Sequence, residues 1–275
     1  MAATMGMGND VLRGFRKFQF TREDISHEVH VTGTGPPVLI MHELPGLTPS
    51  ALGLGRRLAK AGFTTYLPLL FGEAGMSEVT GSYRQLCVSR EFARLEAGVS
   101  APIVDWLRGL AGELSTRHGG SNVGAIGMCL TGAFVIPLIL EPCVTAPVAA
   151  QPGVPFSVSF RAIGIGRGEW MTQINVSDAD LDAAAARARA ENLSLLATRF
   201  ESDRICPAER LDRLQQAFGE RLLRRELPGG STWRQLAAPR HATLTEEYDR
   251  APDRPDEPTR VLFAEVVSFL RERLV

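Results

Sequence analysis

Short apolar runs alternate along the chain with longer stretches in which apolar residues recur every three or four positions. Short runs are typical of buried strands, and the longer spacing is typical of one face of a helix. Strands are expected at 38–41, 64–67, 122–128, 147–151, 193–200 and 221–227, and helices at 49–61, 88–114, 130–140, 177–190, 207–218 and 259–274. This alternation predicts an α/β fold, with a mostly parallel central sheet flanked by helices.

Capping residues sharpen several of these helix ends. Thr48 can accept a backbone N–H, and Pro49 lacks only a donor that the first turn leaves unpaired. Gly62 is expected to end the same helix, because glycine tolerates the left-handed cap conformation. Ser177 and Asp180 resemble a capping box. Pro137 is expected to kink or shorten the helix 130–140.

The domain organisation follows from the absence of any linker in the sequence. We expect one domain over 1–275, since this length is common for a single α/β unit. The segment 152–175 is irregular and contains glycine. It is long for a loop in a compact domain, which makes it a candidate lid or pocket insert.

Composition and charge narrow the class of protein. The chain is 44% apolar and 22% charged, with a formal net charge of −1, which is ordinary for a globular protein. It has no basic stripe for nucleic acid and no polybasic membrane anchor. No apolar run reaches the roughly 18 residues of a membrane span, and Met1 to Phe20 lacks the apolar core of a secretory signal. We therefore expect a cytoplasmic protein, as a monomer or homodimer.

The four cysteines, at 87, 129, 143 and 206, show no paired spacing. In a cytosolic chain they are expected to be free thiols. Cys129 stands out because Ile126–Gly132 lies at a strand-to-helix junction, where a nucleophile elbow would form. Gly127 supplies the small residue before the nucleophile, but Thr131 stands at the matching position after it and Gly132 comes one later. The alternative is a buried structural cysteine, a common fate of free cysteine.

Two further residues could complete a catalytic triad. Asp203 follows an expected strand and precedes an expected helix, and His241 lies between the last strand and the last helix. This is the order of nucleophile, acid and histidine in α/β hydrolases. The alternatives are a helix N-cap for Asp203 and an exposed loop histidine for His241. The remaining histidines, at 27, 30, 42 and 118, lie in expected strands or a polar turn.

From about Val38 to the C-terminus the chain resembles the dienelactone hydrolase family. The resemblance rests on Met41–Gly46 after the first core strand, on Leu95–Val99, on Gly127–Leu130, and on Asp203 and His241. It implies an α/β-hydrolase fold. It also implies that Cys129 is the nucleophile, that His241 is general base and then acid, and that Asp203 orients the imidazole. Glu43 would take part in activating the thiol. The backbone N–H groups of Leu44 and Leu130 would form the oxyanion hole. On its placement alone, Glu43 could instead be a solvated strand-end carboxylate.

The chain departs from the family where the substrate carboxylate is recognised. Thr245 stands where the family has an arginine four residues beyond the catalytic histidine. Tyr83 aligns with the other family arginine, although Arg84 is adjacent. Arg84, Tyr83 and Arg240 are therefore the substrate-binding candidates. Recognition of a carboxylate stays open.

Other classes of protein fit less well. His27-Glu28-Val29-His30 is one residue short of the zinc motif H-E-x-x-H, and in a strand its histidines would point to opposite faces. Gly33-Thr34-Gly35 and Gly53-Leu54-Gly55 lack the third glycine of a nucleotide loop. We expect no metal and no cofactor. The sequence predicts a hydrolase of small carboxylic esters or lactones that acts through a thiol ester. The alternatives are a general carboxylesterase or thioesterase on uncharged esters, and a non-catalytic binding protein on the same fold.

Overall fold

The computed structural model describes residues 10–76, 102–153, 167–229 and 240–275. Within these ranges the chain forms an eight-stranded sheet in the order β1-β2-β4-β3-β5-β6-β7-β8. The strands are β1 (Arg16–Arg22), β2 (Ile25–Gly33), β3 (Pro37–Met41), β4 (Thr64–Pro68), β5 (Val123–Met128), β6 (Val144–Ala150), β7 (Leu195–Phe200) and β8 (Leu222–Leu227). From β4 to β8 every pair is parallel, whereas β1 and β2 pair antiparallel with each other and β2 pairs antiparallel with β4. The predicted α/β-hydrolase architecture is confirmed.

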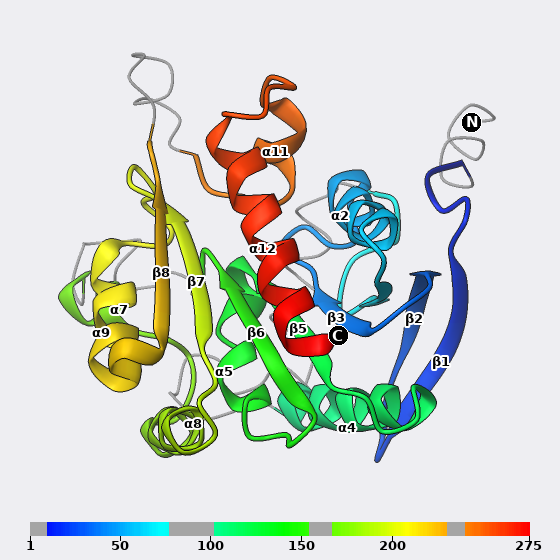
Figure 1. Ribbon diagram of the computed structural model, residues 1–275, viewed down its shortest axis with the longest axis horizontal. Coiled ribbons are helices and arrows are strands. Elements are labelled where there is room, and N and C mark those ends of the chain that lie inside the picture. The colour runs from blue at the N-terminus through cyan, green and yellow to red at the C-terminus, as the bar shows by residue number, and fades with distance from the viewer. Residues whose placement is uncertain (1–9, 77–101, 154–166, 230–239) are drawn as a thin grey trace.

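Helices cover both faces of this sheet (Figure 1). One face carries α2 (Pro49–Lys60) and α12 (Pro258–Leu274), and α12 lies along β5 and β6. The other carries α4 (Pro102–Arg117), α5 (Val135–Leu138), α8 (Asp178–Ala190) and α9 (Ala208–Phe218). Strand β3 shows why both faces are apolar: Leu39 and Met41 join one core cluster and Val38 and Ile40 the other, because successive side chains point to opposite sides.

The predicted caps of α2 and α8 are present. Thr48 Oγ1 accepts a hydrogen bond from Ala51 N at 3.2 Å, and Pro49 begins the helix. Ser177 Oγ accepts one from Asp180 N at 3.0 Å. Each cap satisfies a backbone donor that would otherwise lack a partner.

Three segments differ from the sequence prediction. The expected helix at 130–140 is instead a 3-10 turn, η2 (Cys129–Gly132), followed by the single turn α5, because Pro137 has no N–H to donate to Ala133. Strand β6 begins at Val144 rather than at 147. Pro147 is tolerated inside it because β7 pairs with β6 only from Val148 onward.

The third difference is within the segment predicted to be irregular, where residues Arg167–Thr172 form α7. Helix α11 (Glu246–Arg250) and the 3-10 turn η3 (Gly219–Arg221) are additional to the predicted elements. The expected helix at 88–114 is described only from Pro102, and its earlier part, with 154–166 of the predicted lid, lies outside the described residues. Among the described helices, none is long and apolar enough to cross a membrane.

Candidate active site

Cys129 occupies a strained turn at the carboxyl end of β5. Its φ is +53°, a left-handed conformation that costs a residue other than glycine free energy. Gly127 makes the turn possible, because a Cβ there would lie 2.2 Å from Thr131 O and 2.7 Å from Val135 Cγ2. The half-buried thiol therefore sits on a sharp strand-to-helix turn.

Thr131 and Gly132 explain the irregular spacing of the motif. Thr131 is fully buried, and its Oγ1 accepts from Met128 N at 3.0 Å and lies 2.9 Å from Met41 O, to which it can donate. The threonine thus ties the turn to the end of β3. Gly132 is needed because a Cβ there would lie 2.9 Å from Pro152 Cα. Local hydrogen bonding therefore accounts for Thr131 at its position, and close packing accounts for Gly132.

Asp203 and His241 meet beside this turn. His241 Nδ1 lies 2.7 Å from Asp203 Oδ2. Asp203 is buried, and its other oxygen accepts hydrogen bonds from Ile205 N at 2.8 Å and Cys206 N at 3.0 Å. The carboxylate therefore anchors the turn before α9 and also binds the imidazole. The N-cap of α9 is Pro207, so the N-cap interpretation of Asp203 is wrong.

The imidazole presents its other nitrogen to the thiol. An ionised carboxylate only accepts, so Nδ1 of His241 carries a proton, and Nε2 is buried with no hydrogen-bond partner in the part of the chain that the structure describes. Burial by itself would lower the pKa of His241, but the ionised Cys129 thiol and the Asp203 carboxylate raise it well above its ordinary value. The Cys129 sulfur and the Asp203 carboxylate thus lie where they stabilise a protonated imidazole.

The other described cysteines lie in different surroundings. Cys206 is fully buried, which raises the pKa of its thiol to about 12. Burial also raises the pKa of Cys143, with Glu141 adding to the effect. Neither thiol is suited to act as a nucleophile near neutral pH. Cys87 lies outside the described residues.

Glu43 is buried rather than solvated, with only 6% of its surface exposed. Its carboxylate accepts hydrogen bonds from Gln151 Nε2 at 3.1 Å and from Thr245 Oγ1. The pKa of this carboxyl is raised, because burial outweighs the nearby His241 cation and the two hydrogen bonds, which lower it. Thr243 fixes the network by donating from its backbone N at 3.2 Å to Gln151 Oε1.

The side chain of His42, the residue before Glu43, makes two structural hydrogen bonds. The ring is fully buried, and its Nε2 accepts from Leu70 N at 3.0 Å. Nδ1 must then carry the proton, and it donates to Glu43 O at 3.1 Å. Burial lowers the pKa of His42 to about 4, so the ring is neutral near pH 7 and links the end of β3 to the chain after β4.

Leu44 and Leu130, the candidate oxyanion-hole residues, follow the ends of neighbouring strands. Met41 of β3 pairs with Gly127 of β5 in the parallel register. Each leucine comes three positions after its member of that pair, so both lie at the same edge of the sheet as Cys129. Leu130 is buried and Leu44 partly buried.

The candidate residues for binding a substrate carboxylate are either engaged by other residues or outside the described ranges. Arg240 is largely buried, and its Nε lies 2.7 Å from Glu247 Oε2. Its guanidinium is also 3.8 Å from Glu257 and stacks over the Phe200 ring at 4.2 Å. Thr245 bonds to Glu43 instead of facing open space. Tyr83 and Arg84 lie outside the described residues.

The structure adds residues that the sequence reasoning missed. A Cβ at Gly153 would lie 3.2 Å from Cys129 Sγ and 3.3 Å from Ile205 Cγ2, so the chain after β6 forms one wall beside the thiol. Ile205 forms another part of that wall and is 37% exposed. Gln151 holds Glu43, and its position as the last residue of a predicted strand is the one signal for it in the sequence. Arg210 is the fully buried cation of the region.

The sequence elements of the rival classes lie away from this site. His27 packs against Trp106, with ring centroids 5.0 Å apart, and His30 against Phe15 at 6.4 Å. The described residues include no group of three or more histidine, cysteine, aspartate or glutamate residues that could hold a metal ion.

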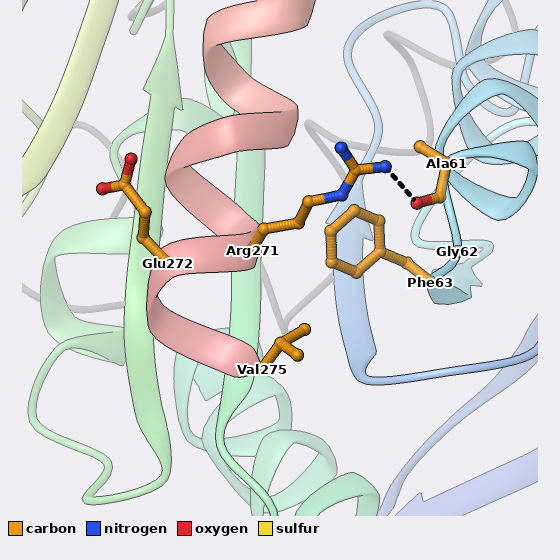
Figure 2. Close-up of a pocket in the computed structure, with 6 residues that line it drawn as sticks. All are labelled: Ala61, Gly62, Phe63, Arg271, Glu272 and Val275. Atoms are coloured by element: carbon orange, nitrogen blue, oxygen red, sulfur yellow. Dashed lines mark hydrogen bonds between the residues drawn. The ribbon is translucent and has the colours of Figure 1, made fainter.

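An open pocket of about 490 Å³ lies at the opposite end of the sheet, between the turn before β4 and the last turn of α12 (Figure 2). Phe63 lies beneath it, and Arg271 spans it to donate to Ala61 O at 2.9 Å. None of its lining residues is a nucleophile or a histidine. The candidate catalytic residues lie instead at the carboxyl ends of the parallel strands, where α/β folds place their sites.

Comparisons with known proteins bear on the family and the fold. The sequence profile of the dienelactone hydrolase family matches residues 27–223. No curated protein matches the chain.

Solved structures share the fold at low sequence identity. A putative dienelactone hydrolase from Klebsiella pneumoniae is 14% identical, with a TM-score of 0.59. The match covers 94% of this chain and 96% of the other. A dienelactone hydrolase from Anabaena variabilis is 14% identical with a TM-score of 0.57, over 96% and 100% of the two chains. The dienelactone hydrolase-like promiscuous phosphotriesterase P91 from metagenomic libraries is 18% identical with a TM-score of 0.58, over 95% and 98%. At these identities the likeness shows the fold.

Proposed function

The chain belongs to the dienelactone hydrolase family, and from this premise we propose that it hydrolyses small carboxylic esters or lactones through a thiol ester on Cys129. The observation that carries the proposal is the Asp203–His241 hydrogen bond of 2.7 Å, which leaves a buried Nε2 for the thiol. A nucleophile, a base and a group that orients the base are the parts that covalent acyl transfer needs.

In the proposed first step, the Cys129 thiolate attacks the ester carbonyl. A C–S bond forms, and the oxyanion is stabilised by the backbone N–H groups of Leu44 and Leu130. His241 gives its Nε2 proton to the departing alkoxide as the C–O bond breaks. The alcohol leaves, or in a lactone the opened ring stays attached, and the acyl group remains on sulfur.

In the second step, His241 Nε2 takes a proton from water while the oxygen attacks the thiol ester. The C–S bond then breaks, the carboxylic acid leaves, and Cys129 returns to the thiolate beside the imidazolium. Glu43 is a second buried carboxyl near the imidazole, and we assign it the role of stabilising the imidazolium together with Asp203. Gln151 and Thr245 hold that carboxylate in place.

Uncharged esters are the second candidate for the substrate class. Two observations favour them: Thr245 is engaged by Glu43, and Arg240 is paired with Glu247 and Glu257. In the described part of the site, neither position offers a cation to a substrate carboxylate. The wall at Gly153 and Ile205 is apolar, which suits a neutral acyl or alcohol group.

The test is turnover of p-nitrophenyl acetate and of a dienelactone by the native protein, by Cys129→Ala and by Cys143→Ala. We expect native activity on at least the neutral ester, its loss in Cys129→Ala, and its retention in the control Cys143→Ala. Iodoacetamide should abolish native turnover. Equal turnover by Cys129→Ala would contradict the nucleophile. No turnover of any ester by the native protein would instead support a binding protein on this fold.

A further inference from the structure

Arg210 of α9 is fully buried, and its guanidinium donates hydrogen bonds to four backbone carbonyls. Nε donates to Gln173 O at 2.6 Å and Nη2 to Trp170 O at 2.8 Å. Nη1 donates to two carbonyls, those of Pro152 at 3.0 Å and Ile205 at 2.7 Å. Burying a charge is costly unless it is hydrogen-bonded, and these four carbonyls stabilise the buried guanidinium.

The two carbonyls bound by Nη1 belong to peptide units that lead directly to the candidate triad. The N–H of the Pro152–Gly153 peptide donates to Cys129 O at 2.8 Å. The N–H of the Ile205–Cys206 peptide donates to Asp203 Oδ1 at 3.0 Å. Nη1 of Arg210 is therefore linked to Cys129 through one peptide unit and to Asp203 through another.

We propose that Arg210 is a positioning residue of the active site, which fixes the Cys129 turn and the Asp203 loop relative to each other. This inference rests on the proposed function for its catalytic meaning. A cation that binds a peptide carbonyl polarises the unit and strengthens the hydrogen bond made by its N–H. Arg210 thus tightens the contacts to Cys129 O and Asp203 Oδ1 at the same time.

The charges around Arg210 agree with this role. Burial lowers the pKa of the Arg210 guanidinium, whereas the neighbouring sulfur atoms and the Asp203 carboxylate raise it. Arginine keeps its proton in proteins, so the guanidinium is a positive charge near the Asp203 carboxylate.

Arg199 of β7 shows by contrast what is particular to Arg210. Arg199 is also buried and donates to Cys206 O at 2.8 Å and Asp203 O at 3.3 Å. It holds the acid loop, but within the described residues none of its hydrogen bonds goes to the Cys129 turn or to Pro152–Gly153. Among these two buried cations, Arg210 is the one that joins both halves of the site.

The test compares Arg210→Met, Arg210→Lys and the control Arg213→Met. Arg213 lies on the same helix, pairs with Asp178 and donates to Thr172 O at 3.4 Å. We expect Arg210→Met to lower kcat for p-nitrophenyl acetate at least thirtyfold with KM changed less than threefold. Arg210→Lys keeps the charge but not the planar fork and should recover part of kcat. The control should keep native values.

Alkylation of Cys129 by iodoacetamide, followed by mass spectrometry of the modified peptide, provides a readout that needs no ester turnover. We expect it to slow at least fivefold in Arg210→Met and to stay native in Arg213→Met. Native kcat and alkylation rate in Arg210→Met would overturn the proposal. If Arg210→Met does not fold, the folded Arg210→Lys decides: a kcat within twofold of native overturns the proposal. A native protein that turns over no ester defeats the proposed function, whereas the alkylation rates still test the role of Arg210.

Discussion

The two halves of the candidate site are held in different ways. The Cys129 half is built largely by nearby residues of the chain: Gly127 opens the turn, and Thr131 bonds to Met128 three positions earlier. The Asp203–His241 half joins residues 38 positions apart, and Arg210 joins that half to the first. The nucleophile turn is thus encoded locally, whereas its alignment with the acid and the base depends on tertiary contacts.

The largest effect on kcat is expected from Asp203→Asn, which changes only the Asp203–His241 half of the site. The amide oxygen can still accept from Ile205 N and Cys206 N, so the turn should survive. The amide NH₂ would face His241 Nδ1 and force the proton onto Nε2, which is the wrong tautomer for a base. By analogy with a serine protease, kcat should fall by about 10⁴-fold.

Steady-state kinetics and urea unfolding together check this change. The control Asp212→Asn alters an exposed carboxylate that pairs with Arg224, and it should keep native kcat. A loss of kcat below tenfold in Asp203→Asn would mean that the acid does not set the tautomer of His241.

Gly127→Ala should have the next largest effect, on the local half. The added methyl group would lie 2.2 Å from Thr131 O, and backbone must move to accept it. Overpacking of this kind costs about 3 kcal/mol in free energy of unfolding, or more. Denaturant unfolding measures the loss. The matched control is Gly168→Ala in α7, where no atom lies within 4 Å of an added Cβ, and its stability should be native. Equal stability of the two variants would show that the turn is not held locally.

The smallest effect is a pH dependence that arises at His42. The pKa of His42 is lowered to about 4 in the folded protein, against about 6.5 when unfolded. Between pH 6.5 and 4, His42 binds a proton in the unfolded chain but not in the folded chain. The free energy of unfolding therefore falls as the pH drops from 6.5 through 4. The shift corresponds to roughly 3 kcal/mol at its fullest extent.

Urea unfolding between pH 4 and 7, of native protein and of His42→Gln, measures this dependence. The variant should lose the part of the slope that comes from His42, although it is less stable at pH 7. An unchanged slope would place the acid sensitivity in other groups.

The sequence predicted the local half better than the tertiary half for a physical reason. The elbow, the caps at Thr48 and Ser177 and the periodicity of α12 are short-range features, and each appears in the structure. The effect of Pro137 was anticipated in kind, but the helix shrank to one turn.

The contacts of Arg210 and Gln151 could not be found from the sequence. Arg210 lies among ordinary charged residues of an amphipathic helix, and nothing in its neighbours indicates that four carbonyls will surround it. The same is true of Thr245, whose bond to Glu43 spans 202 positions. Contacts of this range depend on how the strands are ordered in the sheet, which periodicity does not determine.

Asp203 divides its two oxygens between a backbone turn and an imidazole. Few side chains can meet both demands, since asparagine satisfies the turn but not the tautomer, and a longer acid would displace the loop. Random mutation at this position should therefore yield proteins that fold but do not react, or proteins that do neither. A library that varies position 203 and sorts for folding and for turnover separately would reveal how far the two selections overlap.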